Sequence, residues 1–143
     1  MSITTKKKPK YLITGNISTE FISKQVQNHQ KKTDIGAHTL FLGQVRADKI
    51  DQKRVIAIEY SAYAEMAEKE IANIREKTFE KYDMSCLHIY HSLGEVKVGE
   101  VSLFVMVSTA HRQDTFSALE FIVEQIKLRV PIWKKEIFED GTE

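Results

Sequence analysis

Cysteine is almost absent from this sequence of 143 residues, which contains only Cys86. A single thiol cannot form an internal disulfide, and it cannot build a zinc site that rests on several cysteines. Cys86 lies in the apolar run from Met84 to Ile89, so a buried structural thiol is favoured over a reactive one. Such sparse use of cysteine is typical of a cytoplasmic protein, which is the location we expect.

Long hydrophobic runs and an excess of charge of one sign are absent as well. No apolar stretch approaches the ~20 residues that span a bilayer, and no apolar signal core follows the basic N-terminus. A formal net charge of +1 argues against a protein that holds nucleic acid by bulk electrostatics. An RNA-binding domain that uses the basic C-terminal segment is left as an alternative, although no aromatic–basic sheet motif accompanies that segment.

The chain does contain enough apolar material for one core, with 42% hydrophobic residues beside 29% charged residues. We expect a disordered basic tail over residues 1–10 and a single domain over residues 11–143. Within the domain, alternating patterns predict strands, and spacings of three and four predict helices. The strands are expected at residues 11–14, 38–45, 55–60, 85–93, 101–109 and 133–138, and the helices at residues 19–28, 64–82 and 113–130.

This order of elements predicts an α+β fold, with helices packed on a mixed or antiparallel sheet. A charged hairpin is expected at residues 49–54 and a turn at residues 94–100. The run Val101–Val107 is almost continuously apolar, so its strand is expected in the centre of the sheet. Three sets of residues are expected to face the core: Ile56, Ile58 and Tyr60; Ala67, Ile71, Ile74 and Thr78; and Phe116, Leu119, Val123, Ile126 and Val130.

Basic residues gather at the ends of the expected elements. They are Arg46, His111, Arg112, Lys127 and Lys134. Beside apolar runs, such residues can hold phosphate or carboxylate, and the helix start near Arg112 adds backbone N–H groups and the positive end of the helix dipole. Another interpretation is left open, because Lys127 can offset the helix dipole and Lys134 can protect a strand edge as solvated charge. His111 by itself is more often structural than catalytic.

Lys127 has one further feature, since it borders an apolar stripe. It follows Ile126 directly and lies four residues after Val123. A lysine that is partly desolvated at such a place can act as an acid, a base or a nucleophile.

The patterns of other site types are missing. The sequence has no Gly-rich phosphate loop. His88 and His91 are three residues apart on an expected strand, so they face opposite sides of a sheet and predict no metal site.

Several segments, taken in order over residues 35–140, resemble one known family. Phe41–Arg46 is similar to its aromatic–x–Gly–x–Val–Arg motif, and Ser108–Arg112 to its Ser–x–Ala–His–Arg motif. Lys127–Glu136 is similar to its Lys–x–Arg–x–Pro–hydrophobic–Trp–Lys–Lys–Glu motif, and His91–Glu100 to its glycine-containing turn. The family is that of the large, catalytic subunit of molybdopterin synthase, the MoaE family. Some members continue beyond the last motif with a tryptophan and a further basic residue, whereas this sequence ends at Gly141–Glu143.

The resemblance implies an α/β hammerhead fold with a small added antiparallel β subdomain. It implies a heterotetramer in which two large subunits form a central homodimer and a small ubiquitin-like sulfur carrier of the MoaD type binds each end. The reaction implied is a sulfurtransferase reaction without a bound cofactor or metal. Sulfur passes from the thiocarboxylated C-terminus of the carrier to cyclic pyranopterin monophosphate (precursor Z) and forms the dithiolene of molybdopterin in molybdenum cofactor biosynthesis.

By motif, the resemblance implies that Lys127 is the main catalytic lysine and that Lys134 assists proton transfer or phosphate binding. It also implies a set of residues that bind the substrate or line its pocket, some of them contributed across the dimer: Arg46, His111, Arg112, Phe41 and Val123. The rival hypothesis is a non-catalytic dimeric module that binds a phosphorylated small molecule. That module would have no need of Lys127.

Overall fold

The computed structural model of the protein describes residues 9–143, so most of the basic tail expected over residues 1–10 lies outside the described residues. The strands are β1 (Leu12–Thr14), β2 (Ala37–Gln44), β3 (Lys49–Ile50), β4 (Lys53–Ala62), β5 (Cys86–Lys97), β6 (Val101–Thr109) and β7 (Ile132–Phe138). The helices are α1 (Thr19–His29), α2 (Ala64–Lys81) and α3 (Arg112–Arg129). The predicted order of elements is therefore confirmed, with β3 added at the charged hairpin.

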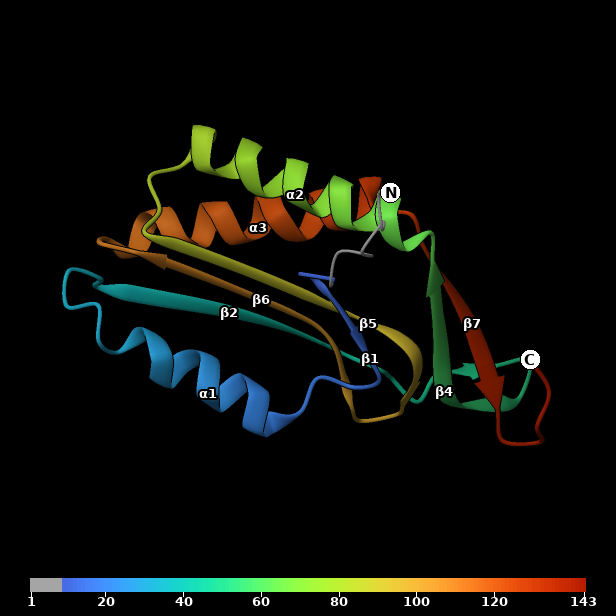
Figure 1. Ribbon diagram of the computed structural model, residues 1–143. Coiled ribbons are helices and arrows are strands. Elements are labelled where there is room, and N and C mark those ends of the chain that lie inside the picture. The colour runs from blue at the N-terminus through green and yellow to red at the C-terminus, as the bar shows by residue number, and fades with distance from the viewer. Residues whose placement is uncertain (1–8) are drawn as a thin grey trace, which may run out of the picture.

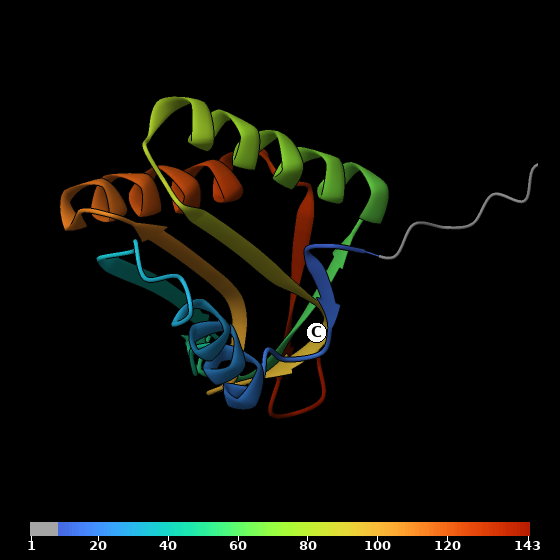
Figure 2. The same ribbon diagram turned by 60° about the vertical axis from the view of Figure 1, so that its left-hand side comes forward.

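The strands form one sheet with helices on both of its faces (Figure 1). Neighbouring strands follow the order β2-β6-β5-β4-β3, while β1 pairs with β5 and β7 pairs with β4. Among the strand pairs of residues 9–143, only the β1–β5 pair is parallel. Helices α2 and α3 lie side by side on one face and α1 lies on the other, as Figures 1 and 2 show. This arrangement confirms the α+β class, and β6 is central as its apolar run predicts.

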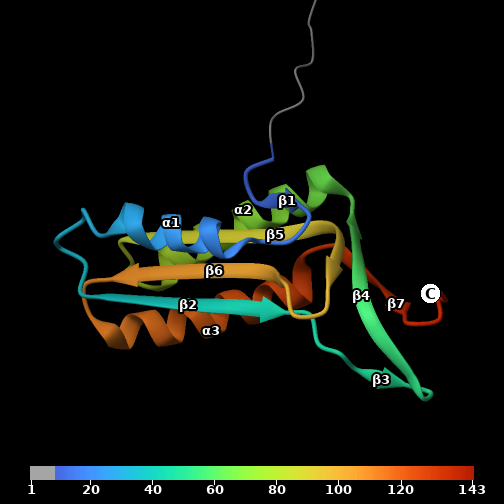
Figure 3. The same ribbon diagram turned by 90° about the horizontal axis from the view of Figure 1, so that it is seen from below.

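The sheet has two parts that meet at Gly94. Strand β5 pairs with β6 as far as His91 and with β4 from Gly94 to Lys97. Gly94 has a φ of +85°, which glycine adopts without the steric cost of a Cβ. The turn predicted over residues 94–100 is confirmed only at residues 98–100, because Gly94 bends the strand instead of ending it and β5 continues to Lys97. Strands β3, β4 and β7, with residues 94–97 of β5, stand away from the main sheet at one end (Figure 3), and we call this part the wing.

Helices α2 and α3 cover one face of the main sheet and bury its largest core. The predicted inner face of α2 is confirmed, because Ala67, Ile71, Ile74 and Thr78 are all buried. The stripe predicted for α3 is confirmed at Ile126, which is buried, but it is wrong at Phe116, which is 62% exposed. The other buried residues of the helix are Thr115, Ala118 and Ile122. A shift of one residue turns a helix by about 100°. Val130, just after the helix, is buried as predicted, and Leu119 and Val123 are partly buried beside the same core.

The wing begins with a tight hairpin between β3 and β4. Asp51 and Gln52 both have positive φ, as the preferred two-residue hairpin turn requires. Along β4 the predicted face holds for Tyr60, which is buried, and partly for Ile58, but Ile56 is 44% exposed. Val55 and Ala57 are buried in place of Ile56, because the register with β7 shifts between these two residues. A β-bulge of this kind changes which residues face inward.

Two local devices fix the elements on either side of the main sheet. Ser18 caps α1, since its Oγ accepts a hydrogen bond from the backbone of Phe21 at 3.1 Å. Glu68 of α2 accepts backbone hydrogen bonds from three successive residues at the start of β1: Lys10, Tyr11 and Leu12. These bonds hold β1 against α2. No helix among residues 9–143 is long and apolar enough to cross a membrane.

Candidate functional site

Arg46 and Lys134 both adjoin the small core where the wing meets the main sheet. That core contains Val45, Tyr60 and Val96, with Ile132 packed against it. Arg46 directly follows Val45, whose backbone N–H donates to the carbonyl of Glu100 at 3.0 Å. Lys134 is two residues after Ile132 on β7, so the two side chains leave the same face of the strand. The wing thus brings two cationic side chains to one end of the main sheet.

Lys134 has a defined neighbourhood. It pairs across the strands with Tyr60, whose ring meets the His91 ring edge-on at a centroid distance of 5.1 Å. Burial lowers the pKa of His91, and the nearby charge of Lys134 lowers it further, while a hydrogen bond to the Ser92 carbonyl acts in the opposite direction. His91 is therefore a neutral ring near neutral pH, and Lys134 is the cation beside it.

Arg46 is held only loosely. Its Nε lies 3.1 Å from Oδ1 of Asp48 and its Nη2 donates to Oδ2 at 3.3 Å, but its side chain is 83% exposed. An exposed pair of this kind contributes only about 0–1 kcal/mol. Asp48 therefore leaves the guanidinium of Arg46 available to an incoming phosphate.

Lys127 lies in the last turn of α3, near the point where the chain enters the wing. Val123 is one turn earlier on the same side of α3, and it packs with Phe41 of β2 against the main core. Both apolar residues are partly buried, whereas Lys127 is exposed. The partial desolvation expected for Lys127 is absent in the single chain, because nothing covers the end of α3 on this side within residues 9–143.

His111 and Arg112 lie at the other end of α3. His111 is the N-cap residue and makes no side-chain capping bond, so the first backbone N–H groups of the helix lack a side-chain acceptor there. Both side chains are exposed. The hydroxyl of Thr115 donates to the carbonyl of Arg112 at 2.7 Å and holds the first turn. This end of α3 offers a charged guanidinium and the positive end of the helix dipole to an anion.

The two groups of predicted residues are not brought together in one chain. Arg112 and Lys127 are 15 positions apart on α3, which corresponds to about 22 Å along the helix axis. Arg46, Lys127 and Lys134 share the wing end, while His111 and Arg112 occupy the far end. A hollow of about 330 Å³ lies elsewhere, and none of the predicted site residues lines it. Its lining consists of Lys10, Tyr11, Arg75, Leu87, His88, Ile89 and Tyr90.

A second cluster of reactive side chains was missed by the sequence analysis. His29, Cys86 and His88 lie together on the α1 side of the main sheet, opposite α2 and α3. Burial lowers the pKa of His88 to about 4, and the nearby groups His29, Arg75 and Lys32 act in the same direction. The spacing of Cys86 and His88 on one strand face was visible in the sequence, but the approach of His29 was not.

Both the sequence and the fold of this chain resemble those of known proteins. The family described as MoaE protein matches residues 16–129. The molybdopterin synthase catalytic subunit of Bacillus subtilis (strain 168) is 41% identical over 125 residues, which cover 87% of this chain and 76% of that protein. The family match contains all of the predicted site residues except Lys134, which follows its end.

Solved structures agree. The crystal structure of molybdopterin synthase from Staphylococcus aureus matches with a TM-score of 0.80 and 34% identity, covering 95% of this chain and 96% of that chain. A complex of subunits 1 and 2 of the molybdopterin-converting factor from Helicobacter pylori 26695 matches with a TM-score of 0.76. Its identity of 24%, over 91% of this chain and 85% of that chain, shows the fold alone. From the family match, the sequence identity and the shared fold, this chain belongs to the MoaE family of molybdopterin synthase catalytic subunits.

Proposed function

We propose that this chain is the sulfurtransferase subunit of a molybdopterin synthase and acts on cyclic pyranopterin monophosphate. Its sulfur comes from the C-terminal thiocarboxylate of a small ubiquitin-like carrier. Two carriers each deliver one sulfur. Each transfer forms a carbon–sulfur bond on the pterin side chain and breaks a carbon–oxygen bond: one opens the cyclic phosphate, which stays attached as a terminal phosphate, and the other releases water. Water also cleaves each acyl–sulfur bond, which leaves the sulfur on the substrate and a carboxylate on the carrier. Membership of the MoaE family supports this reaction.

The position of the Cys86 thiol is the main observation that supports the proposal. Cys86, the only cysteine in the sequence, is buried beside α1, while Lys127 and Lys134 lie at the wing end of the α3 side. Leu87 and Ile89 pack on the α2 and α3 side, so Cys86 and His88 of the same strand point to the α1 side. A transferable sulfur therefore has to arrive on a partner, and a flexible carrier tail can reach the exposed lysines.

In this proposal the cations of the wing end act on charge that develops during transfer. Lys127 is the main catalytic lysine, and it stabilises the oxyanion formed at the terminal glycine of the carrier. Lys134 assists proton transfer or holds the terminal phosphate, and Arg46 binds the phosphate. Phe41 and Val123 form the apolar wall beside Lys127. The neutral ring of His91 keeps the surroundings of Lys134 free of a second positive charge.

The exposure of all these cations fits a site that is completed by other chains. The carrier tail covers the wing end and excludes water, which strengthens the electrostatic interactions inside. His111 and Arg112 come from a second copy of this chain, because the length of α3 keeps them away from Lys127 of their own chain. Central homodimers with a two-fold axis bring the two ends of such a helix pair together reciprocally.

The test is reconstitution of the reaction. This chain is mixed with a thiocarboxylated carrier and cyclic pyranopterin monophosphate, and molybdopterin is measured for wild type, Lys127→Ala and Lys24→Ala. Lys24 is an exposed lysine of α1 and serves as the matched control. We expect product from wild type and Lys24→Ala, and a rate lower by about 10²- to 10³-fold in Lys127→Ala, which is the usual cost of removing a group that stabilises an oxyanion.

Other results are equally informative. Product at the wild-type rate from Lys127→Ala would move the catalytic centre to another residue, with Lys134 tested next by the same assay. Binding of the carrier and of the pterin without any product from wild type would overturn the proposed reaction in favour of a binding module.

A further inference from the structure

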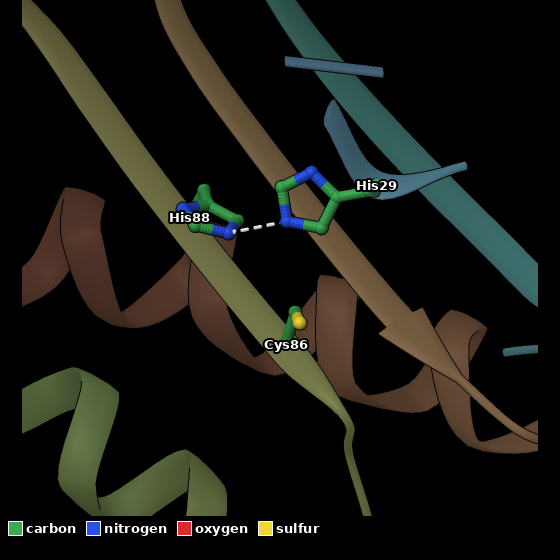
Figure 4. Close-up of side chains that lie close together, drawn as sticks. All are labelled: His29, Cys86 and His88. Atoms are coloured by element: carbon green, nitrogen blue, oxygen red, sulfur yellow. Dashed lines mark hydrogen bonds between the residues drawn. The ribbon is translucent and has the colours of Figure 1, made fainter. Parts of the chain in front are cut away.

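The last turn of α1 and the first residues of β5 bring together three side chains that commonly ligate metals. Figure 4 shows His29, Cys86 and His88 converging from these two elements. Cys86 and His88 are two residues apart on β5 and share its α1 face, while His29 is buried in the last turn of the helix above them. One ligand atom of each residue lies within 4.8 Å of the others.

The hydrogen bonds determine which ring nitrogens are free. Nδ1 of His29 lies 2.6 Å from the carbonyl of Gln25, which can only accept, so the proton of His29 is on Nδ1. Nε2 of His29 therefore carries a lone pair directed at His88, whose Nε2–H donates to it over 2.7 Å. A backbone carbonyl that fixes the tautomer of a histidine in this way is the usual support of a metal-ligating imidazole.

We propose that His29, Cys86 and His88 form a site for a single zinc ion, bound by Nε2 of both histidines and by the thiolate of Cys86. Two imidazoles and one thiolate are a ligand set that suits zinc, with the fourth position open to water. The hard ions magnesium and calcium require oxygen ligands, which this cluster does not offer.

The geometry needs only a small adjustment. Zinc–nitrogen bonds of about 2.0–2.1 Å and zinc–sulfur bonds of about 2.3 Å place tetrahedral ligand atoms roughly 3.3–3.6 Å apart. The two Nε2 atoms are 2.7 Å apart and must separate by about 0.6 Å as the ion enters. Sγ of Cys86, which lies within 4.8 Å of both, must approach them by at most about 1.2 Å. His29 ends a helix next to the loop that leads to β2, so a rotation of its ring can supply this movement.

The protons balance without a co-reactant. Zinc replaces the thiol proton of Cys86, which leaves to solvent, and the proton of His88 moves from Nε2 to Nδ1. Nζ of Lys32 donates to Sγ of Cys86 at 2.8 Å, and this bond can persist to the zinc-bound thiolate. The ion then joins α1 to β5, and it adds to the hydrogen bond between the two histidine rings and to the edge-on contact of Phe21 with Tyr90.

The experiment is a titration of the metal-free full chain, prepared without a histidine tag. Cobalt(II) serves as the spectroscopic probe, because bonding to a thiolate gives a near-ultraviolet charge-transfer band and four-coordination gives intense visible bands. We expect one cobalt ion per chain with both features, displacement by zinc, and a higher melting temperature with zinc than without it. Magnesium at the same concentration should leave the melting temperature unchanged.

Variants identify the ligands. Cys86→Ser should lose the thiolate band and weaken zinc binding by more than about 100-fold, the upper end of what loss of a mere supporting contact costs. His29→Gln should weaken zinc binding similarly. His38→Gln is the matched control, since His38 bonds Ser108 through Nδ1 and stands beside the cluster without belonging to it. Its zinc binding should equal that of wild type.

Two results would overturn the site. One is a wild-type chain that binds cobalt without a thiolate band or does not bind it at all. The other is unchanged zinc affinity in both Cys86→Ser and His29→Gln. Because the wild-type spectrum needs no mutation, it decides the question even if a variant fails to fold.

Discussion

The two ends of α3 carry opposite halves of one predicted site, and they differ in their surroundings. At the C-terminal end, Lys127 stands near the wing, where Lys134 and the neutral ring of His91 form a structured environment. At the N-terminal end, His111 and Arg112 project from the first turn with no other predicted residue near them. The C-terminal end resembles a site that is open to solvent in the single chain. The N-terminal end resembles only one part of a site.

This difference indicates how the protein divides its work. In the proposed mechanism, the wing end holds the groups for chemistry, and the far end holds the groups that recognise an anion. An α-helix is a rigid spacer, so no motion of a folded single chain closes about 22 Å between Arg112 and Lys127. Bringing both groups of residues into one site requires a second chain. Experiments that change one end of α3 at a time test this difference between the two ends.

The largest effect is expected from mixing two inactive variants. Lys127→Ala and Arg112→Ala each remove one half of every site in their own homodimers. In a mixed dimer, one site loses both groups and the other retains both. With half of the dimers mixed, about a quarter of the wild-type molybdopterin synthesis should return on co-refolding. The rate is measured against each variant refolded alone.

No recovery in the mixture, although mass spectrometry shows mixed dimers, would place both groups in one site of the same chain. The pairing Lys127→Ala with Lys134→Ala is the control. Both residues belong to the same end, so that mixture should stay inactive.

A smaller effect is expected from substitutions that test how α3 packs on the sheet. Ile122→Ala removes a fully buried side chain from the face of α3 that packs on the sheet, and should lower the free energy of unfolding by about 2–5 kcal/mol. Phe116→Ala, on the exposed side, should change it by less than about 0.5 kcal/mol. Urea denaturation of both variants compares the two faces. A larger loss for Phe116→Ala than for Ile122→Ala would restore the stripe predicted from the sequence.

The phase of α3 shows what a sequence pattern leaves undecided. Helix α2 has a single apolar face, and its buried residues were predicted correctly. Helix α3 has apolar or small residues on two adjacent faces, one with Ala118 and Ile122 and one with Leu119 and Val123. Only packing against β2 and β6 selects between them, and this choice favours Thr115 and Ala118 because small residues let the helix lie close to the sheet.

Like the buried face of α3, the candidate site could be predicted only in part from the sequence. Motifs identify the basic residues, and the length of α3 already separates Arg112 from Lys127. The location of Arg46 beside the wing could not be predicted from the sequence, because it depends on how β5 bends at Gly94 to reach β4. The contact of His29 with Cys86 and His88 joins segments that are far apart in the sequence. No local sequence pattern predicts such a contact.

The smallest effect concerns the charge at the wing end. Lys134→Gln removes a cation that lowers the pKa of His91, so the pKa of His91 should rise while staying below its ordinary value of 6.5, because burial remains the main cause. A histidine with a lowered pKa contributes full stability above about pH 6.5 and loses it as the pH falls toward the pKa of the folded state. Acid destabilisation should therefore begin at the same pH but be slightly weaker in Lys134→Gln. Proton NMR titration of the His91 ring measures the shift, with Lys135→Gln as the control: Lys135 faces the other side of β7 and pairs with Glu143. An equal change in the pKa of His91 in both variants would contradict the placement of Lys134 beside His91. The wing end would then not provide a structured environment for Lys134.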